Sequence, residues 1–378
     1  MINENKKIHL FRPFFDKDEM QEVQKVLDSG WVSQGPKVKE FEEKVSKFIG
    51  VKHAIAVTNC TCALHLANLS IGLTKRDEVI VADYTFPATG HSVLYCDARP
   101  IFVDVDPKTY NIDPEKIEEN ITPKTKAIIP VHTFGQSADM DPIMEIAEKH
   151  DLYVIEDAAC ALGSKYNKRN VGSIGDIGCF SFHARKGITT GEGGMVVTND
   201  KEIAEKIRYL SVFGMKTAWE REKTESFMIP QFFDIGYNYK MSDISAAIGV
   251  AQMKKIDRII QQKQNLAKYW DNILDQMTLI TKPFNSNKCF HVYQSYVALV
   301  DKQINRNKVI EKMELEGIQA QIGTYASHIQ PVYQYKKKCP VSFDIFNRAI
   351  ALPLYYSLKN EEINEISRVL TKILKGAS

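Results

Sequence analysis

Residues 179–194 read Cys179-Phe-Ser-Phe-His-Ala-Arg-Lys186-Gly-Ile-Thr-Thr-Gly-Glu-Gly-Gly194. The apolar run Cys179–Phe182 predicts a buried strand, and a second strand is predicted at Met195–Thr198. Between them lies a basic loop with several glycines, whose backbone can approach a ligand closely. Lys186 is therefore presented from the core and not from a polar helix face. Desolvation lowers the pKa of a lysine, and its free amine attacks carbonyl groups to form a Schiff base.

The composition is that of an ordinary globular protein. The 378 residues, 44% hydrophobic and 25% charged, have room for one large domain and a smaller one. The net charge of +2 does not indicate a broad surface for nucleic acid. Seven cysteines, an odd number without zinc spacing, favour a reducing compartment and no metal site. The polar N-terminus and the lack of an apolar run of about 18 residues lead us to expect a cytoplasmic protein without a membrane span.

Short apolar runs alternate with helical patterns through the first half of the chain. After helices at residues 16–29 and around Val38–Phe48, the sequence predicts strands at Ala54–Val57, Glu78–Val81, Pro100–Val103, Lys126–Val131 and Leu152–Ile155. Helices are predicted between them at Thr61–Ile71, Thr89–Cys96 and Met140–His150. Strands without strict polar alternation, separated by helices, indicate an α/β fold with a parallel or mixed sheet covered on both faces.

The pattern changes after Met241. Residues Ser242–Gln264 predict one or two long helices, and the strand-like and amphipathic pieces that follow include Tyr293–Leu299. This mixture is typical of a smaller α+β domain. We place the boundary between residues 240 and 260 and divide the chain into a large domain, 1–245, and a small C-terminal domain, 246–378.

Ligands of such sheets bind beyond the carboxyl ends of the strands. Those positions hold Thr58–Thr61, Asp83–Phe86, His132–Gln136, Glu156–Asp157 and Ser181–Lys186. Thr61 opens a helix whose N-terminus could bind phosphate, although a hydroxyl there is more often only a cap. Phe86 would more often be a core residue, whereas the carboxylate of Asp157 could hold a proton on a ring nitrogen. Phosphate cap, aromatic ring, buried carboxylate and Schiff-base lysine together meet the requirements of pyridoxal 5′-phosphate (PLP), and no Walker or dinucleotide-binding glycine motif competes.

From near Leu10 to the C-terminus the sequence resembles the DegT/DnrJ/EryC1/StrS family of PLP-dependent sugar aminotransferases. The matching stretches are Gly30-Trp-Val-Ser-Gln-Gly35, Thr58-Asn-Cys-Thr-Cys-Ala-Leu-His65, Asp77-Glu-Val-Ile-Val81, Val154-Ile-Glu-Asp-Ala-Ala159, Ser181-Phe-His-Ala-Arg-Lys186 with Gly191-Glu-Gly-Gly194, and Gly236-Tyr-Asn-Tyr-Lys-Met-Ser-Asp243. The resemblance implies the aspartate-aminotransferase fold (PLP fold type I), with a mixed, mostly parallel sheet between helices in the large domain.

The same resemblance implies a role for each matching residue. Lys186 would carry PLP as a Schiff base and Asp157 would pair with its ring nitrogen, both as catalytic residues. The implied cofactor site also includes Phe86 against the ring, Cys60, Thr61 and Ser181 at the phosphate, Asn238 from the neighbouring subunit of a homodimer, and Cys160, which stands where many relatives have Gln or Glu at the ring hydroxyl. Trp31, Tyr325 and His328 are the expected substrate contacts, within the stretches 31–37, 213–233 and 325–328 that we expect to determine specificity.

The resemblance also implies a reaction. A branch of the family that dehydrates sugars has histidine in place of the lysine, so Lys186 favours transamination. We expect the transfer of an amino group from L-glutamate, which leaves as 2-oxoglutarate, to a nucleotide-diphospho-sugar, with the Phe-His-Ala-Arg-Lys form closest to enzymes of 4-keto-6-deoxyhexoses. The alternatives are a 3-keto sugar or keto-cyclitol as acceptor and, in another class, a non-catalytic regulatory or binding protein of the same fold.

Overall fold

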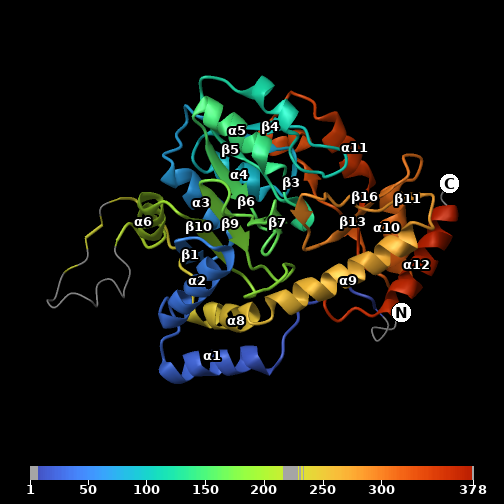
Figure 1. Cartoon of the computed structure of the whole chain (residues 1–378), viewed down its shortest axis with the longest axis horizontal. Coiled ribbons are helices and arrows are strands. Elements are labelled where there is room, and N and C mark those ends of the chain that lie inside the picture. Colours follow the sequence, from blue (N-terminus) through green and yellow to red (C-terminus); the bar gives the residue numbers. More distant parts are fainter. Residues whose placement is uncertain (1–6, 216–228, 230, 233, 377–378) are drawn as a thin grey trace.

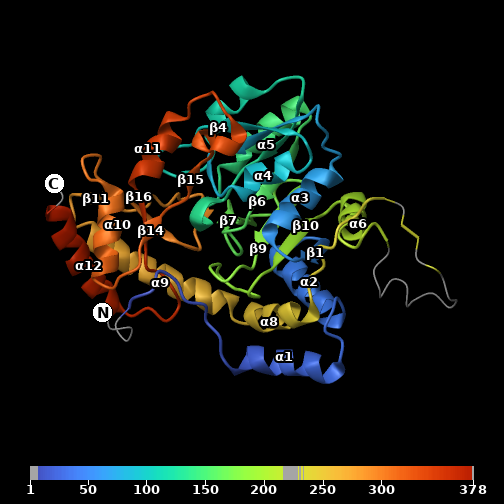
Figure 2. The same cartoon turned by 180° about the vertical axis from the view of Figure 1, so that it is seen from behind.

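A computed structural model describes residues 7–215, 229, 231–232 and 234–376. Figures 1 and 2 show a large sheet flanked by helices and a smaller sheet near the C-terminus. The large sheet contains β1 (His53–Val57), β2 (Glu78–Ala82), β4 (Arg99–Val103), β5 (Thr125–Ile129), β6 (Tyr153–Asp157), β9 (Ile177–Ser181) and β10 (Gly194–Thr198). Its helices are α1 (Lys17–Ser29), α2 (Pro36–Ile49), α3 (Cys60–Ser70), α4 (Ala88–Leu94), α5 (Met140–His150), α6 (Lys201–Leu210) and α8 (Asp243–Met253).

The seven strands lie in the order β1-β10-β9-β6-β5-β2-β4. Strand β10 is antiparallel to both of its neighbours, and the remaining neighbouring pairs are parallel. The prediction of a mixed, mostly parallel sheet is therefore confirmed. Strands β2, β9 and β10 are buried along their whole length, which explains why their sequences are apolar without alternation.

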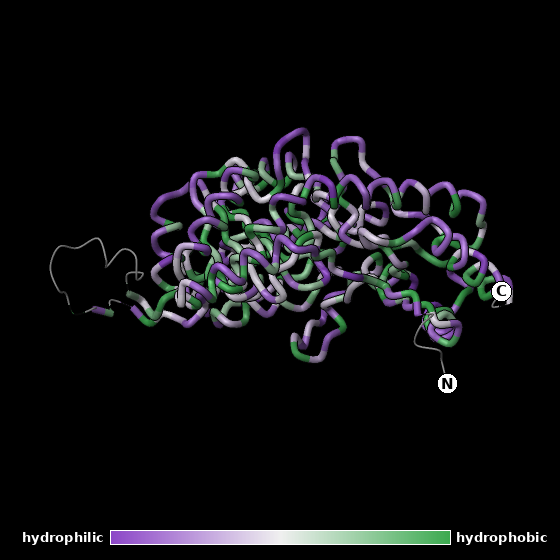
Figure 3. The backbone as a smooth tube through the Cα atoms, turned by 90° about the horizontal axis from the view of Figure 1, so that it is seen from below, coloured by the Kyte–Doolittle hydropathy of each residue, from purple (hydrophilic) through white to green (hydrophobic). Residues whose placement is uncertain are grey.

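The two faces of this sheet have separate cores. On one face Val79 and Val81 pack with residues of α3, α4 and α6, and on the other face Ile80 packs with residues of α2, α5 and α8. In Figure 3, hydrophobic residues are concentrated in the centre of the molecule, and hydrophilic residues lie along many of the outer helix turns. Val38, Phe41 and Val45 are buried at helical spacing, as predicted for α2.

The smaller sheet is antiparallel, with the order β11-β13-β16-β14. Its strands are β11 (Ile280–Thr281), β13 (Tyr296–Val300), β14 (Gln321–Ile322) and β16 (Ala349–Leu352), accompanied by α10 (Arg306–Leu315), α11 (Pro340–Arg348) and α12 (Asn360–Lys375). Helix α9 (Ile256–Leu274) joins the two parts: Ile256 and Ile260 belong to the first core, whereas Leu266 and Trp270 belong to the second. The division at residue 245 remains a prediction.

Two short pairings bring later segments to the large sheet. β15 (Tyr325–Ala326) pairs with β3 (Tyr84–Thr85), and β12 (Cys289–Phe290) pairs with β7 (Lys165–Tyr166), which also pairs with β8 (Arg169–Asn170). The segment that contains Tyr325 and His328 therefore lies in space beside β3, the short strand that follows β2.

The predicted helix boundaries are right to within about two residues where caps define them. Asp16 caps α1 in a capping box with Glu19, and Gly30 ends it with φ of 72°. The segment 242–264 contains two helices, since α8 ends at Met253 and α9 begins at Ile256. Among the described residues, no helix combines the length and apolar character needed to cross a membrane.

Candidate active site

The predicted residues converge where β6, β9 and β2 end. Asp157 is the last residue of β6, and it lies opposite Cys179 in the parallel pairing with β9. The loop after β9 is held by hydrogen bonds from Phe182 N to Gly193 O (2.8 Å) and from Thr190 N to Phe182 O (3.0 Å). This closed loop fixes the position of Lys186 beside the sheet edge.

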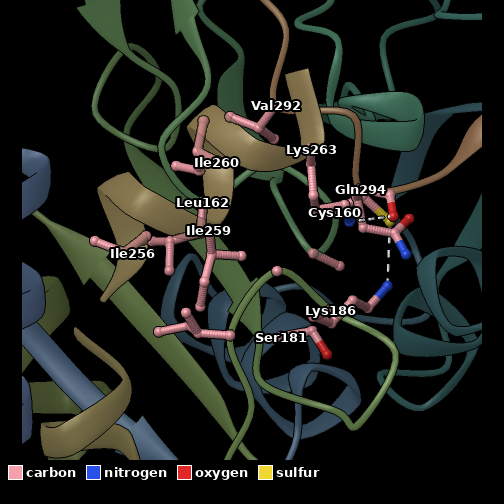
Figure 4. Close-up of a pocket in the computed structure, with 13 residues that line it drawn as sticks. Cys160, Leu162, Ser181, Lys186, Ile256, Ile259, Ile260, Lys263, Val292 and Gln294 are labelled. Carbon is pink, nitrogen blue, oxygen red and sulfur yellow. Dashed lines mark hydrogen bonds between the residues drawn. The ribbon is translucent and has the colours of Figure 1, made fainter. Parts of the chain in front are cut away.

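Lys186 contacts the thiol of Cys160, which lies in the segment after β6. Its Nζ donates a 3.1 Å hydrogen bond to Sγ of Cys160, as Figure 4 shows. Desolvation lowers the pKa of Lys186, as the sequence predicts, but Cys160 and, to a smaller extent, Cys60 and Asp157 raise it, so that the net pKa lies above the ordinary value. The expectation of a lowered pKa is therefore wrong for this state, because Cys160, Cys60 and Asp157 together outweigh burial, which is the largest single influence.

Asp157 is buried and hydrogen-bonded at both carboxylate oxygens. Thr89 Oγ1 donates to its Oδ2 (2.7 Å), and the backbone N–H of Ala159 donates to its Oδ1 (3.2 Å). Burial raises the pKa of Asp157, whereas the hydrogen bond from Thr89 and the charge of Lys186 lower it. A cationic ring nitrogen placed against this carboxylate would favour its ionised form.

The neighbouring acid, Glu156, has a structural role. Its carboxylate accepts hydrogen bonds from the backbone N–H groups of Gly172, Ile174 and Gly175, and it contacts His132 Nε2 at 2.9 Å. Because these partners occupy both oxygens, only Asp157 of this acidic pair faces the candidate site.

The N-terminus of α3 supplies backbone donors near the same loop. Asn59 caps the helix by accepting from Cys62 N (2.9 Å), while the N–H groups of Cys60 and Thr61 have no hydrogen-bonded acceptor among the described residues. A Cβ atom on Gly194 would lie 2.4 Å from the backbone of Asn59, so glycine permits strand β10 to approach this turn. Gly194 is also opposite Ser181 in the strand pairing, so Ser181 lies across from the residue that approaches this turn.

Phe86, Tyr325 and His328 lie close together after strand β2, where β15 pairs with β3. The Phe86 ring is 64% exposed and meets the Tyr325 ring edge-on, with centroids 6.2 Å apart. His328 is fixed by buried Asp83, whose carboxylate accepts from His328 N (2.6 Å) and contacts Nδ1 (2.7 Å). Cys339 also lies close, with ligand atoms of the three residues within 4.8 Å of one another, but the direct Asp83–His328 contacts account for this cluster without an ion.

Two predicted residues are not joined to this group by hydrogen bonds within the described part of the chain. Asn238 is exposed, and its side chain accepts a hydrogen bond from Lys240. Trp31 is 38% exposed and donates from Nε1 to Gln34 O (3.1 Å). The roles of both residues remain predictions. Of the predicted specificity stretch 213–233, residues 216–228, 230 and 233 lie outside the described residues.

Figure 4 shows a pocket between the lysine loop and α9. Lys186, Ser181 and Cys160 line one side of it, and Ile259 and Lys263 of α9 line the other. The structure thus adds three residues that sequence reasoning did not single out, namely Thr89, Asp83 and Lys263. Only Asp83 could have been found from the sequence, since it directly follows a predicted strand. Thr89 and Lys263 lie in helices, where a polar residue is not by itself a sign of a functional site.

Comparison with known proteins gives agreement over nearly the whole chain. Residues 13–371 match the DegT/DnrJ/EryC1/StrS aminotransferase family. The spore coat polysaccharide biosynthesis protein SpsC of Bacillus subtilis is 40% identical over 97% of this chain and 96% of its own length. GDP-perosamine synthase of Caulobacter vibrioides is 37% identical over 97% of this chain and 98% of its own.

A solved structure is similar over the same extent. Spr1654 of Streptococcus pneumoniae, described as a candidate sugar aminotransferase, matches with a TM-score of 0.92 in its pyridoxamine phosphate (PMP) form, at 25% identity over 97% of this chain and 99% of that one. Its PLP form matches with a TM-score of 0.90. The aspartate-aminotransferase-like fold expected from the sequence is confirmed.

Proposed function

We propose that this chain, which belongs to the DegT/DnrJ/EryC1/StrS aminotransferase family, transfers the amino group of L-glutamate to a nucleotide-linked keto-deoxysugar. The family is PLP-dependent, and the chain is a PLP-dependent sugar aminotransferase. Because the chain belongs to an aminotransferase family, the alternative of a non-catalytic regulatory or binding protein is not retained. The presence of Lys186 agrees with this conclusion. The observation that carries the proposal is the meeting of Lys186 and buried Asp157 at the carboxyl edge of one sheet.

The donor set of the site fits PLP. The open N–H groups at the start of α3 and the Ser181 hydroxyl suit a phosphate, as helix N-termini commonly do. The carboxylate of Asp157 suits a protonated ring nitrogen, and the amine of Lys186 suits an aldehyde. Phe86 is exposed beside Tyr325 and offers a free ring face, consistent with its predicted stacking role. When bound, PLP supplies an electron-withdrawing ring that accepts the electron pair of a breaking C–H bond.

The chain's own residues then have separate tasks. The Nζ atom of Lys186, once free, would take the proton from Cα of the amino acid as general base. It would then return the proton, as general acid, to the carbon on the other side of the nitrogen. Asp157 holds a proton on the ring nitrogen through its charge, and Thr89 holds Asp157 in place by a 2.7 Å hydrogen bond. In the second half-reaction the same groups act in reverse order, and Lys186 delivers the proton to the carbon that becomes the amino-bearing carbon of the sugar.

For the acceptor we propose a 4-keto-6-deoxyhexose on a nucleoside diphosphate. Its support is the Phe-His-Ala-Arg-Lys sequence before Gly187, together with the names of two relatives, a GDP-perosamine synthase and a spore coat polysaccharide biosynthesis protein. His328, fixed by Asp83 beside Tyr325, is the proposed contact to the sugar. We further propose a homodimer with shared sites, because Asn238 is exposed within the single chain while its sequence context matches the family.

A labelling experiment tests this proposal. The purified PLP-loaded protein is incubated with [15N]glutamate and a panel of GDP-, UDP- and dTDP-linked 4-keto and 3-keto sugars. We expect 15N in one amino sugar, identified by mass spectrometry and NMR, together with 2-oxoglutarate. The Lys186→Ala variant is the control and should form no product. Absence of label from every 4-keto sugar, or full activity of the variant, would contradict the proposal.

A further inference from the structure

Lys263 is a buried cation without a carboxylate partner. Its side chain projects from α9 into the molecule and is 3% exposed. Nζ donates a 2.8 Å hydrogen bond to the backbone carbonyl of Gln294. Among the described residues, no Asp or Glu oxygen lies within 4.0 Å of this amine. An ammonium group in this position lacks the opposite charge that normally accompanies a buried lysine.

A nearby lysine shows what a structural explanation would require. Lys255, at the start of the same helix, is also buried, but it contacts Glu19 at 2.7 Å and also pairs with Asp16. Those two carboxylates account for its burial. Lys263 instead has apolar helix neighbours such as Ile259 and Ile260, and burying its charge costs several kcal/mol. Methionine would fill the same volume at this position without that cost, so packing alone does not explain a lysine.

Lys263 borders the same hollows as Lys186, the proposed catalytic lysine. Lys186 and Lys263 line the same pocket, and Figure 4 shows both side chains pointing toward the corner formed by Cys160 and Gln294. A second hollow is also lined by both lysines and adds the exposed guanidinium of Arg12.

We propose that Lys263, together with Arg12, binds a carboxylate of the amino donor while the donor's Cα faces the amine of Lys186. This inference rests on the proposed function, because it identifies the donor as a small carboxylate-bearing amino acid. A carboxylate would supply the missing counter-charge, and charge-assisted hydrogen bonds to it are stronger than bonds between neutral groups. Two cations at different points of one hollow suit a dicarboxylate such as glutamate better than an amino acid with one carboxylate.

Binding of glutarate tests the proposal without any chemistry. Glutarate has the five carbons and two carboxylates of glutamate but no amino group, and its affinity for the PLP-loaded protein is measured by calorimetry at pH 6.5. We expect Lys263→Met to weaken glutarate binding at least tenfold and Arg12→Gln to weaken it at least threefold. The matched control is Lys268→Met on the exposed face of the same helix, which should leave the affinity unchanged.

The same variants distinguish this site from a phosphate site and from a failure of the proposed function. Binding of GDP and UDP should be the same in Lys263→Met and in the unaltered protein. Unchanged glutarate affinity in Lys263→Met, or loss of nucleotide affinity in its place, would overturn the assignment. If no sugar receives 15N from glutamate but glutarate binding still requires Lys263, the proposed acceptor is wrong and the carboxylate site stands. Arg12→Gln alters an exposed side chain and so provides a second test if Lys263→Met does not fold.

Discussion

The hydroxyl of Thr89, in helix α4, donates a 2.7 Å hydrogen bond to Oδ2 of Asp157 at the end of strand β6. This bond stabilises the ionised carboxylate, whereas burial favours the protonated form. Thr89 is therefore a positioning residue, which acts on the cofactor through Asp157. The contribution of Thr89 to cofactor binding depends on the charge of Asp157 and not only on the shape of the site. A charge-dependent contribution changes with pH, whereas a purely steric one does not.

Replacing Thr89 with Val should weaken PLP binding by roughly ten- to a hundredfold, since a hydrogen bond to a charged group contributes about 1.5–3 kcal/mol. Loss of the donor raises the pKa of Asp157, so the carboxylate becomes protonated at a higher pH than in the unaltered protein. The loss of affinity should therefore be greater at pH 6 than at pH 8. Absorbance titrations of PLP at the two pH values measure it. Thr89→Ser keeps the hydroxyl and should bind nearly normally; an equal loss at both pH values would indicate a purely steric effect.

Cys160→Ala should lower the pKa of Lys186. Cys160 accepts the 3.1 Å hydrogen bond from Nζ and is the strongest of the influences that raise this pKa, so its removal leaves the lowering effect of burial less opposed. In cofactor-free protein, labelling of Lys186 by an amine-reactive reagent should then reach half its maximum at lower pH. Peptide mass spectrometry follows this labelling. Cys289→Ala, which removes a thiol bonded to Ser137 O, is the control and should leave the pH profile unchanged. An unchanged profile in Cys160→Ala would contradict the account.

The sequence predicts this site well where strand ends define it. Asp157 and Lys186 converge because β6 and β9 are parallel neighbours, and an apolar run followed by a polar residue is visible in the sequence of each. Thr89 could not be predicted, because its partner lies 68 positions away and threonine inside a helix has no distinctive local pattern. Lys263 stands in the polar sequence Gln261–Asn265, which reads as a solvated helix face until the packing of α9 is known. The raised pKa of Lys186 could not be predicted from the sequence, because it depends on the contact between Nζ and the Cys160 thiol, which only the structure shows.

Gly194→Ala should destabilise the protein and weaken PLP binding. The added Cβ would lie 2.4 Å from the Asn59 backbone and 2.7 Å from Cys60 N, so β10 and the N-terminus of α3 would have to separate. Overpacking of this kind costs about 1–3 kcal/mol. Gly187→Ala is the control for stability, because no atom lies within 4 Å of the position that its Cβ would occupy. The free energy of unfolding of this variant should stay within about 0.5 kcal/mol of that of the unaltered protein. Denaturant unfolding compares the two, and equal midpoints would show that the close approach is relaxed easily.

Asp83→Ala should impair the use of the sugar more than the use of glutamate. Asp83 accepts from His328 N and contacts its Nδ1, so the substitution frees the imidazole that we propose for the sugar side. We expect the KM for the keto-sugar to rise roughly tenfold, in line with the loss of a hydrogen bond to a charged group. The rate of the half-reaction with glutamate should remain within about twofold. His328→Ala should have the same effect, and the double variant should be no worse than either single one. Equal damage to both half-reactions would point to a general loss of folding.

The affinity for glutarate should fall as pH rises through neutrality. Burial lowers the pKa of Lys263 to about 7, with Lys186 lowering it further and Cys160 opposing the shift. Glutarate carboxylates titrate near pH 4 to 5 like that of glutamate, so above pH 6 only the protein changes charge. The ammonium form binds the anion, so affinity should be highest near pH 6. It should fall below about pH 5, where the carboxylates of glutarate become protonated, and should fall toward tenfold per pH unit above pH 7.

This pH dependence separates a binding role of Lys263 from a structural one. Several other titratable or charged groups lie around the amine of Lys263. They are Lys186, Cys160, Arg12, His291, Tyr355 and Tyr356. In Lys263→Arg the guanidinium stays charged, so glutarate affinity should remain high and lose its dependence on pH between 6 and 9. In Lys263→Met the affinity should be low at every pH. Calorimetry in two buffers of different ionisation enthalpy should also detect proton uptake on binding at pH 7.5 in the unaltered protein only. A profile that persists in both variants would assign the titration to another of these groups and remove Lys263 from the site.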